Sequence, residues 1–222
     1  MASVQTAVNQ TLSGPPAWVA TFAAVAILGM AARGMPWHKL RGDAEAWRVL
    51  LIATAVFCGL RFFNADALVG VRLHFIGAAL STLMFGPRFA LWTLAVASLA
   101  AWAMGSAWYG WAPDFLICGA LPVAVAHAVA VGIERRLPPN VFVYVMVRGF
   151  LGGGAAIAAC DLAKAAVAYA LDESASAAYL AATLPMMFGE GFMTGGAIVL
   201  IVVYRPQWCA TFDDARYLPP QA

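Results

Sequence analysis

Residues 113–136 read PDFLICGALPVAVAHAVAVGIERR, an apolar run that closes on a pair of arginines. Six further apolar runs of similar length occur along the chain. Each is close to the ~20 residues that a helix needs to cross ~30 Å of hydrocarbon. The pattern therefore predicts seven membrane spans, over residues 17–33, 47–63, 70–86, 88–105, 113–133, 141–170 and 180–204.

Basic residues occupy alternate gaps between these runs. Of the 13 Lys and Arg residues, nine follow the first, third, fifth or seventh run: Arg33, Lys39, Arg41, Arg48, Arg88, Arg135, Arg136, Arg205 and Arg216. Lysine and arginine are retained on the cytoplasmic side during membrane insertion. We therefore expect the N-terminus outside and the C-terminus in the cytoplasm.

Composition points to the same class of protein. Hydrophobic residues make up 63% of the chain and charged residues 11%, and the mean hydropathy is +0.80. A soluble domain of 222 residues could not bury that much apolar surface in one core. Backbone groups in lipid must be paired within helices or a closed barrel, and long runs without alternation favour helices. The prediction is an all-α integral membrane protein. The net charge of +2 is small and dispersed, so no nucleic acid is expected as a partner.

The runs divide the chain into an external N-terminal segment, 1–16, one transmembrane helical domain, 17–205, and a cytoplasmic tail, 206–222. The third run is the weakest, because Arg72 and His74 shorten its apolar core and Gly86-Pro87 ends it. We expect this span to be tilted or broken.

The sixth run carries two features of its own. Asp161 and Lys164 are three residues apart, which places them on one helix face as an expected ion pair. Gly149 and Gly152 to Gly154 form a small-residue surface, on which helix backbones can approach closely. That surface is either a packing seam inside the bundle or a contact for a partner subunit. The four cysteines show no C-x-x-C spacing, and we expect them to pack structurally.

Four ionisable side chains lie in the outward half of four different predicted spans: His74, Asp114, Asp161 and Glu190. Charged groups in lipid cost about 2.5 to 3.5 kcal/mol each, so those present usually face a cavity or a partner. Imidazole and carboxylates together suit a divalent transition-metal ion. The four residues are therefore candidate metal ligands.

Each candidate also has a structural interpretation. Asp161 is the expected partner of Lys164, and Asp114 follows Pro113, where it could cap a helix. Glu190 lies between two glycines, where another backbone can come close, and His74 could be a hydrogen-bonded core histidine.

Several stretches resemble one family. Residues 73–80, LHFIGAAL, followed by LMFGP at 83–87, are similar to the H-x-x-G-A-x-L…L-x-G-P segment of the CbiM/NikM family, the membrane components of energy-coupling factor transporters for cobalt and nickel. Supporting stretches are ERRLP at 134–138, residues 185–195 around Glu190, and the tail from Tyr204 to Asp214, which resembles the poorly characterised branch of predicted permeases.

The resemblance implies a seven-helix bundle in the bacterial inner membrane that captures a divalent metal from outside. It also implies a coupling transmembrane protein and cytoplasmic ATPase subunits as partners. In the family, the metal is held by nitrogens of the amino terminus, of a histidine after the initiator methionine, and of the histidine that aligns with His74. This chain departs from that pattern, because it begins Met1-Ala2-Ser3 and has no histidine before His38.

Three functions follow as hypotheses. The first is uptake of a metal ion, with energy from partner subunits, because the sequence has no P-loop motif. The second is a membrane assembly protein that keeps the bundle but has lost the metal site, using the small-residue surface and the tail to dock a neighbour. The third is an intramembrane enzyme with Glu190 and His74 as acid and base, which no catalytic motif supports. We therefore expect no enzymatic activity and no tightly bound cofactor.

Overall fold

The computed structural model describes residues 13–62, 71–171 and 175–218. Most of the predicted external segment 1–16, and the last residues of the predicted tail, 219–222, lie outside the described residues. The described chain is helical and contains no strand. The α-helices are α2 (Pro15–Arg33), α3 (Ala44–Leu60), α4 (Ala78–Phe85), α5 (Pro87–Ala103), α6 (Trp111–Phe115), α7 (Leu121–Glu134), α8 (Gly152–Ala170), α9 (Ala175–Tyr204) and α10 (Asp214–Tyr217).

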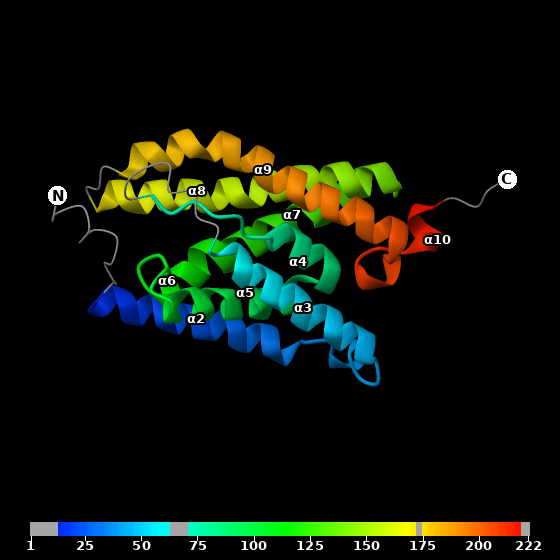
Figure 1. Ribbon diagram of the computed structural model, residues 1–222, viewed down its shortest axis with the longest axis horizontal. Coiled ribbons are helices and arrows are strands. Elements are labelled where there is room, and N and C mark those ends of the chain that lie inside the picture. Colours follow the sequence, from blue (N-terminus) through cyan, green and yellow to red (C-terminus); the bar gives the residue numbers. More distant parts are fainter. Residues whose placement is uncertain (1–12, 63–70, 172–174, 219–222) are drawn as a thin grey trace.

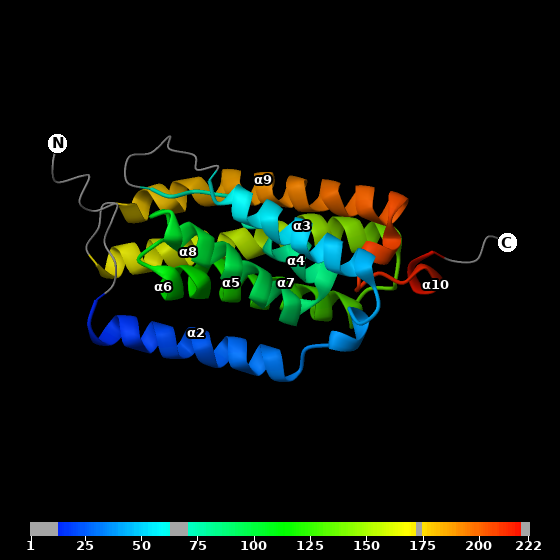
Figure 2. The same ribbon diagram turned by 60° about the horizontal axis from the view of Figure 1, so that its bottom comes forward.

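Two π-helical segments and two 3-10 turns connect or extend the α-helices of the described chain. A π-helical segment, η2 (Leu116–Ala120), joins α6 to α7, and another, η3 (Val143–Leu151), leads into α8. Two 3-10 turns, η1 (Trp37–Lys39) and η4 (Pro206–Trp208), lie at helix connections. The long helices run side by side along the long axis of the molecule (Figures 1 and 2), with the start of α2 at one end and α10 at the other.

Among the described residues, four continuous helical segments are long and apolar enough to cross a membrane: Pro15–Arg33, Trp111–Glu134, Val143–Ala170 and Ala175–Tyr204. Helices α3 and α5 have 17 residues each, which corresponds to about 25 Å at the α-helical rise. The all-helical membrane architecture is confirmed. The count of seven spans and the orientation of the termini stay predictions.

The outer surface of the bundle is apolar. On α2, Trp18 and Phe22 are 66% and 72% exposed, and on α9, Phe188 and Phe192 are 63% and 68% exposed. Meanwhile Lys164, Asp161 and Glu190 are almost completely buried. Apolar side chains outside and ionisable ones inside are the arrangement expected of a bundle surrounded by lipid.

The third predicted span is broken, as expected from its short apolar core. Residues 71–77 are non-helical, and only Ala78–Phe85 form a helix, so this run is not the ~20-residue helix that a simple span requires. Gly77, at the start of α4, has a φ of 69°, and a Cβ there would overlap with the ring of Phe57. Glycine is therefore required where the extended segment turns into the helix.

The backbone of this extended segment is hydrogen-bonded by side chains of α8 and α9. The Lys164 Nζ donates to the carbonyl of Arg72 at 3.2 Å, and the Arg72 N–H donates to the Tyr179 hydroxyl at 3.4 Å. Farther along, the N–H groups of Ile76 and Gly77 donate to the Glu190 carboxylate at 3.0 and 2.7 Å. Non-helical backbone at membrane depth is tolerated where protein groups take over its hydrogen bonds in this way.

The prediction that Asp161 and Lys164 form an ion pair is wrong. Lys164 directs its ammonium to the extended segment and over the ring of Tyr179, 5.7 Å from the centroid. Both carboxylate oxygens of Asp161 are buried and have no hydrogen-bond partner among the described residues. The buried, non-helical backbone of residues 71–77 competes for the lysine, because a buried carbonyl without a donor is costly.

The small-residue surface of the sixth run is a seam inside the bundle. A Cβ at Gly153 would lie 3.0 Å from Thr194 and 3.2 Å from the carbonyl of Glu190, both on α9. A Cβ at Gly149 would meet the backbone of Gly195 at 3.4 Å. The two longest helical segments therefore pack nearly backbone to backbone, which fixes the height of Glu190 against the extended segment.

The described part of the predicted tail folds back on the bundle. Ala210 N donates to the Met84 carbonyl at 2.8 Å, and the Thr211 hydroxyl donates to the Leu83 carbonyl at 2.7 Å, so the tail caps the last turn of α4. The Cys209 thiol, whose pKa burial raises to about 11, also donates to the Leu83 carbonyl. Tyr217 is 3% exposed. Much of the tail is therefore engaged within its own chain.

Candidate metal site

Three metal-ligating side chains meet in the core. His74 from the extended segment, Asp114 from α6 and Cys118 from η2 each offer one ligand atom, and these atoms lie within 4.8 Å of one another. All three side chains are buried. Asp114 and Cys118 are four residues apart on a continuous helical segment, so they share one face. His74 reaches them because residues 71–77 are extended and enter the bundle beside that face.

Arg61 lies among these three ligands. It stands at the C-terminus of α3, and its Nη2 donates to the Asp114 Oδ2. Its Nη1 lies 3.4 Å from the Nδ1 of His74, and the guanidinium also interacts with the Cys118 side chain. The arginine is 3% exposed. The cluster is therefore held together by an internal cation.

Asp114 makes a second contact, with backbone. Its Oδ1 accepts a hydrogen bond from the N–H of Trp108 at 3.0 Å, which ties the loop before α6 to the cluster. The N-cap of α6 is Gly110, so Asp114 is not the capping residue that its position after Pro113 suggested. Its carboxylate instead accepts hydrogen bonds from Arg61 and from the loop before α6.

A second thiol adjoins the cluster. The Sγ atoms of Cys118 and Cys160 are 3.5 Å apart, and both cysteines are free and buried. The two residues are far apart in sequence, on η2 and α8. No spacing motif could have revealed them as neighbours, and the expectation of structural packing did not anticipate that the Cys118 thiol lies beside His74 and Asp114.

The other two sequence-predicted ligands lie elsewhere. Glu190 directs both carboxylate oxygens to the backbone N–H groups of Ile76 and Gly77, and thereby fixes the segment that carries His74. Asp161 is buried next to Cys160 in the chain, and its carboxylate oxygens have no hydrogen-bond partner among the described residues. The structure thus brings together His74 and Asp114, and does not bring Glu190 or Asp161 into the same set of ligand atoms.

Sequence reasoning missed Arg61 and Cys118 as members of the site. A signal for Arg61 was available, because it is a charged residue inside the predicted span 47–63, and membrane energetics single out such residues. For Cys118, the signal was its position one helical turn after Asp114.

The cluster is closed to solvent in this structure. His74 is 4% exposed, Cys118 1% and Asp114 0%. The polar residues that surround them are packed between α3, α6, η2, α8 and α9.

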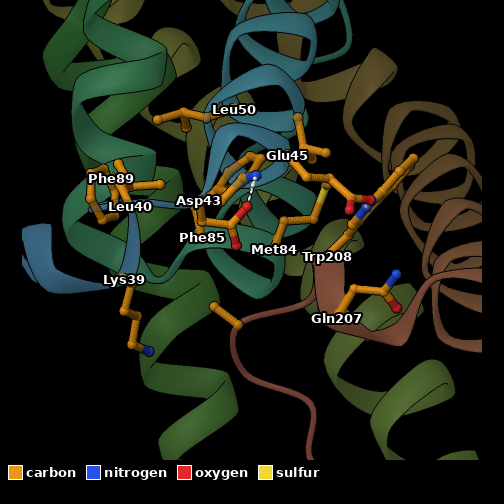
Figure 3. A pocket seen from close by; sticks show the side chains of 13 residues that line it. Lys39, Leu40, Asp43, Glu45, Leu50, Met84, Phe85, Phe89, Gln207 and Trp208 are labelled. Atoms are coloured by element: carbon orange, nitrogen blue, oxygen red, sulfur yellow. Dashed lines mark hydrogen bonds between the residues drawn. The ribbon is translucent and has the colours of Figure 1, made fainter.

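A separate groove of about 240 Å³ lies near the end of the molecule where α10 is found, between the start of α3, the α4–α5 junction and the tail (Figure 3). Its two carboxylates are engaged: Asp43 accepts from the N–H of Ala46 at 2.9 Å, and Glu45 accepts from the Trp208 indole at 2.7 Å. The residues that line it include neither histidine nor cysteine. This groove therefore lacks the chemistry of a transition-metal site.

Comparison with known proteins gives one family. A family model described as the cobalt uptake substrate-specific transmembrane region, CbiM, matches residues 8–208. No curated protein and no solved structure matches the chain. The matched range contains Arg61, His74, Asp114, Cys118 and Glu190 and nearly all of the described bundle. The chain belongs to the CbiM family of substrate-specific transmembrane components of cobalt uptake.

Proposed function

We propose that this protein is the substrate-capture component of an energy-coupling factor type transporter and that it binds a divalent first-row metal ion, Co²⁺ or Ni²⁺, at His74, Asp114 and Cys118. The observation that carries the proposal is the convergence of these three ligand atoms within 4.8 Å, from three segments of the bundle. Family membership supports the choice of cobalt as the substrate class.

The donor set fits such an ion. Imidazole nitrogen, carboxylate oxygen and thiol sulfur together suit borderline first-row cations, whereas Mg²⁺ and Ca²⁺ prefer oxygen alone. Of the three ligand atoms, only that of His74 is a nitrogen. Oxygen and sulfur donors in place of nitrogens favour Co²⁺ in a tetrahedral geometry over square-planar Ni²⁺.

In this proposal the remaining candidates have supporting roles. Glu190 positions the extended segment so that His74 points at the other ligands. Asp161 stays a candidate for an additional ligand, because its buried oxygens have no hydrogen-bond partner among the described residues. Neighbouring carboxylates would offset the charge of an incoming ion in the low dielectric of the bundle.

Transport would depend on other subunits. The sequence contains no P-loop, so cytoplasmic ATPases and a coupling transmembrane protein would supply the energy. The location would be the bacterial inner membrane, with lipid around the apolar surface of α2 and α9. The metal would enter from outside, where the predicted topology places the end of the bundle that holds His74.

The direct test is metal analysis of the purified protein in nanodiscs after equilibration with Co²⁺. The wild-type protein should bind one Co²⁺ with a thiolate-to-cobalt charge-transfer band. His74→Ala should lose the metal, and Cys118→Ser should lose the band and weaken binding by at least about 10-fold. His127→Ala and Cys209→Ser are matched controls outside the cluster, and both should retain wild-type binding. Equal metal content in wild type and His74→Ala, or none in either, would contradict the proposal.

The second candidate function is assembly. Burial of the cluster and the guanidinium among its ligands favour a protein that keeps the bundle without binding an ion. In that case the wild-type protein would bind no Co²⁺ in the experiment above. It would nevertheless co-purify with the coupling protein in amounts that the His74→Ala variant does not change.

A further inference from the structure

We infer that Arg61 is a resident cation of the metal site: its guanidinium occupies the place that the substrate ion takes, and the ion must displace it to bind. The inference rests on the proposed function and adds to it a residue that controls affinity. Neither the sequence pattern nor the family match assigns a role to this arginine.

The contacts of the Arg61 guanidinium place it where a bound metal ion would lie. Nη2 donates to Asp114, Nη1 lies 3.4 Å from the Nδ1 of His74, and the same group interacts with Cys118. These are the three residues whose ligand atoms lie within 4.8 Å of one another. A single planar cation therefore contacts Asp114 and His74 directly and acts electrostatically on Cys118. A metal ion coordinated by the same atoms would overlap with it.

Charge supplies the second step. Asp114 is fully buried, and an isolated carboxylate at that depth is strongly unfavourable, so the site requires a positive charge whether or not metal is present. Arg61 provides that charge in the metal-free protein. When Co²⁺ arrives, the ion satisfies Asp114, and the arginine becomes an additional cation that the site repels.

The surroundings of Arg61 allow its side chain to leave the ligands when a metal ion binds. The residue caps the C-terminus of α3, where the helix ends, and its Nε is buried without a hydrogen-bond partner among the described residues. The guanidinium is thus held at one end by the ligands and is not fixed at the other. A long side chain at a helix end can rotate away without disrupting the helix.

The consequence is a competition that sets the affinity for metal. Every binding event in the wild-type protein must break the Arg61–Asp114 pair and the contact with His74. Removal of the guanidinium eliminates that competition and leaves the carboxylate in need of a cation. We therefore expect Arg61→Gln to bind Co²⁺ at least about 10-fold more tightly than wild type, which corresponds to about 1.4 kcal/mol.

The experiment measures Co²⁺ affinity by isothermal titration in nanodiscs for wild type, Arg61→Gln and Arg61→Lys. Lysine keeps a positive charge but loses the fork that spans two ligands, so its affinity should lie between the other two. It also guards against misfolding of the glutamine variant, since an ammonium can still pair with Asp114. Arg148→Gln is the matched control: Arg148 is 5% exposed and pairs with Glu134 at 2.5 Å, away from the cluster. It should bind like wild type.

The outcomes separate this inference from the proposed function. Tighter binding in the order Gln, Lys, wild type supports it. Wild-type binding with equal or weaker binding in both Arg61 variants overturns the inference and leaves the proposed function intact. Binding in Arg61→Gln but not in wild type supports Arg61 as the occupant and counts against metal uptake by the natural protein. No binding in any of them overturns both.

Discussion

The buried polar residues of this protein are of two kinds. Some form hydrogen bonds to irregular backbone of the same chain, and others are placed where they could bind a substrate. Glu190 and Lys164 replace the hydrogen bonds that residues 71–77 lost when the third span was broken. His74, Asp114 and Cys118 converge on a point. A charge inside a membrane span is thus a signal of function or of irregular backbone, and only its partners distinguish the two.

Glu190 offers a test of that distinction. Glu190→Ala leaves the N–H groups of Ile76 and Gly77 buried without an acceptor, and each unsatisfied group costs about 1–3 kcal/mol. We expect the thermal stability of the metal-free protein in detergent to fall clearly. Glu190→Gln should fall less, because its amide oxygen can still accept from one of the two donors.

The matched control is Asp161→Asn, which changes another buried carboxylate whose oxygens have no hydrogen-bond partner among the described residues. Its metal-free stability should fall less than that of Glu190→Ala, because only the attraction to the buried Lys164 is lost and no hydrogen bond is broken. If Glu190→Ala were as stable as wild type while its Co²⁺ binding was lost, Glu190 would be a ligand and not a positioning residue.

Among the helices, the pair formed by η3–α8 and α9 determines where the site can form. Their glycines allow close approach, and α9 presents Glu190 to the extended segment at the height set by that approach. At the other end of the segment, α4 is only eight residues long and has its last carbonyls capped by the tail. The irregular third span is therefore supported at both ends by neighbouring elements.

The seam makes a prediction about Gly153. A Cβ at this position meets Thr194 at 3.0 Å and the Glu190 carbonyl at 3.2 Å, so Gly153→Ala should separate the helices and cost about 1–3 kcal/mol through overpacking. Thermal unfolding in detergent measures the loss. Gly152→Ala is the control, because its nearest neighbours would be 3.6 and 3.8 Å away, at ordinary contact distance. Equal stability of the two variants would refute a tight seam at Gly153.

For the whole molecule, the structure gathers the basic residues of alternate gaps at one end. Arg88 donates to the carbonyl of Gly34, Arg216 lies 3.6 Å from Glu134, and Trp208 bonds to Glu45. These contacts join the end of α2 to the start of α5, the end of α7 to α10, and the tail after α9 to the start of α3, at the end where α10 lies (Figure 1). One basic end is what the positive-inside rule requires of a membrane bundle.

Orientation can be tested with reporter fusions. A C-terminal green fluorescent protein should fluoresce, and a C-terminal alkaline phosphatase should be inactive, because the basic end is predicted to lie in the cytoplasm. A phosphatase fused instead in the gap between α6 and the end of α5, near Gly105, should be active. Active phosphatase at the C-terminus would reverse the predicted topology and place the His74 cluster toward the cytoplasm.

The sequence by itself determined the class of the molecule, because hydropathy and the placement of Lys and Arg act locally on each run during insertion. Outside the third span it placed the long helices to within about five residues, and it identified the weakness of that span and the polar residues His74 and Asp114 as needing a partner. It could not determine which side chains meet, because depth along a helix says nothing about rotation around it.

Only the tertiary structure decided the partners. The break at residues 71–77 turned Lys164 from an ion-pair partner of Asp161 into a donor to backbone, and Glu190 into an acceptor for it. It also brought Arg61 and Cys118 to His74 from segments that no sequence spacing connects. The physical reason is that buried backbone must be satisfied first, and the side chains that remain then define the site.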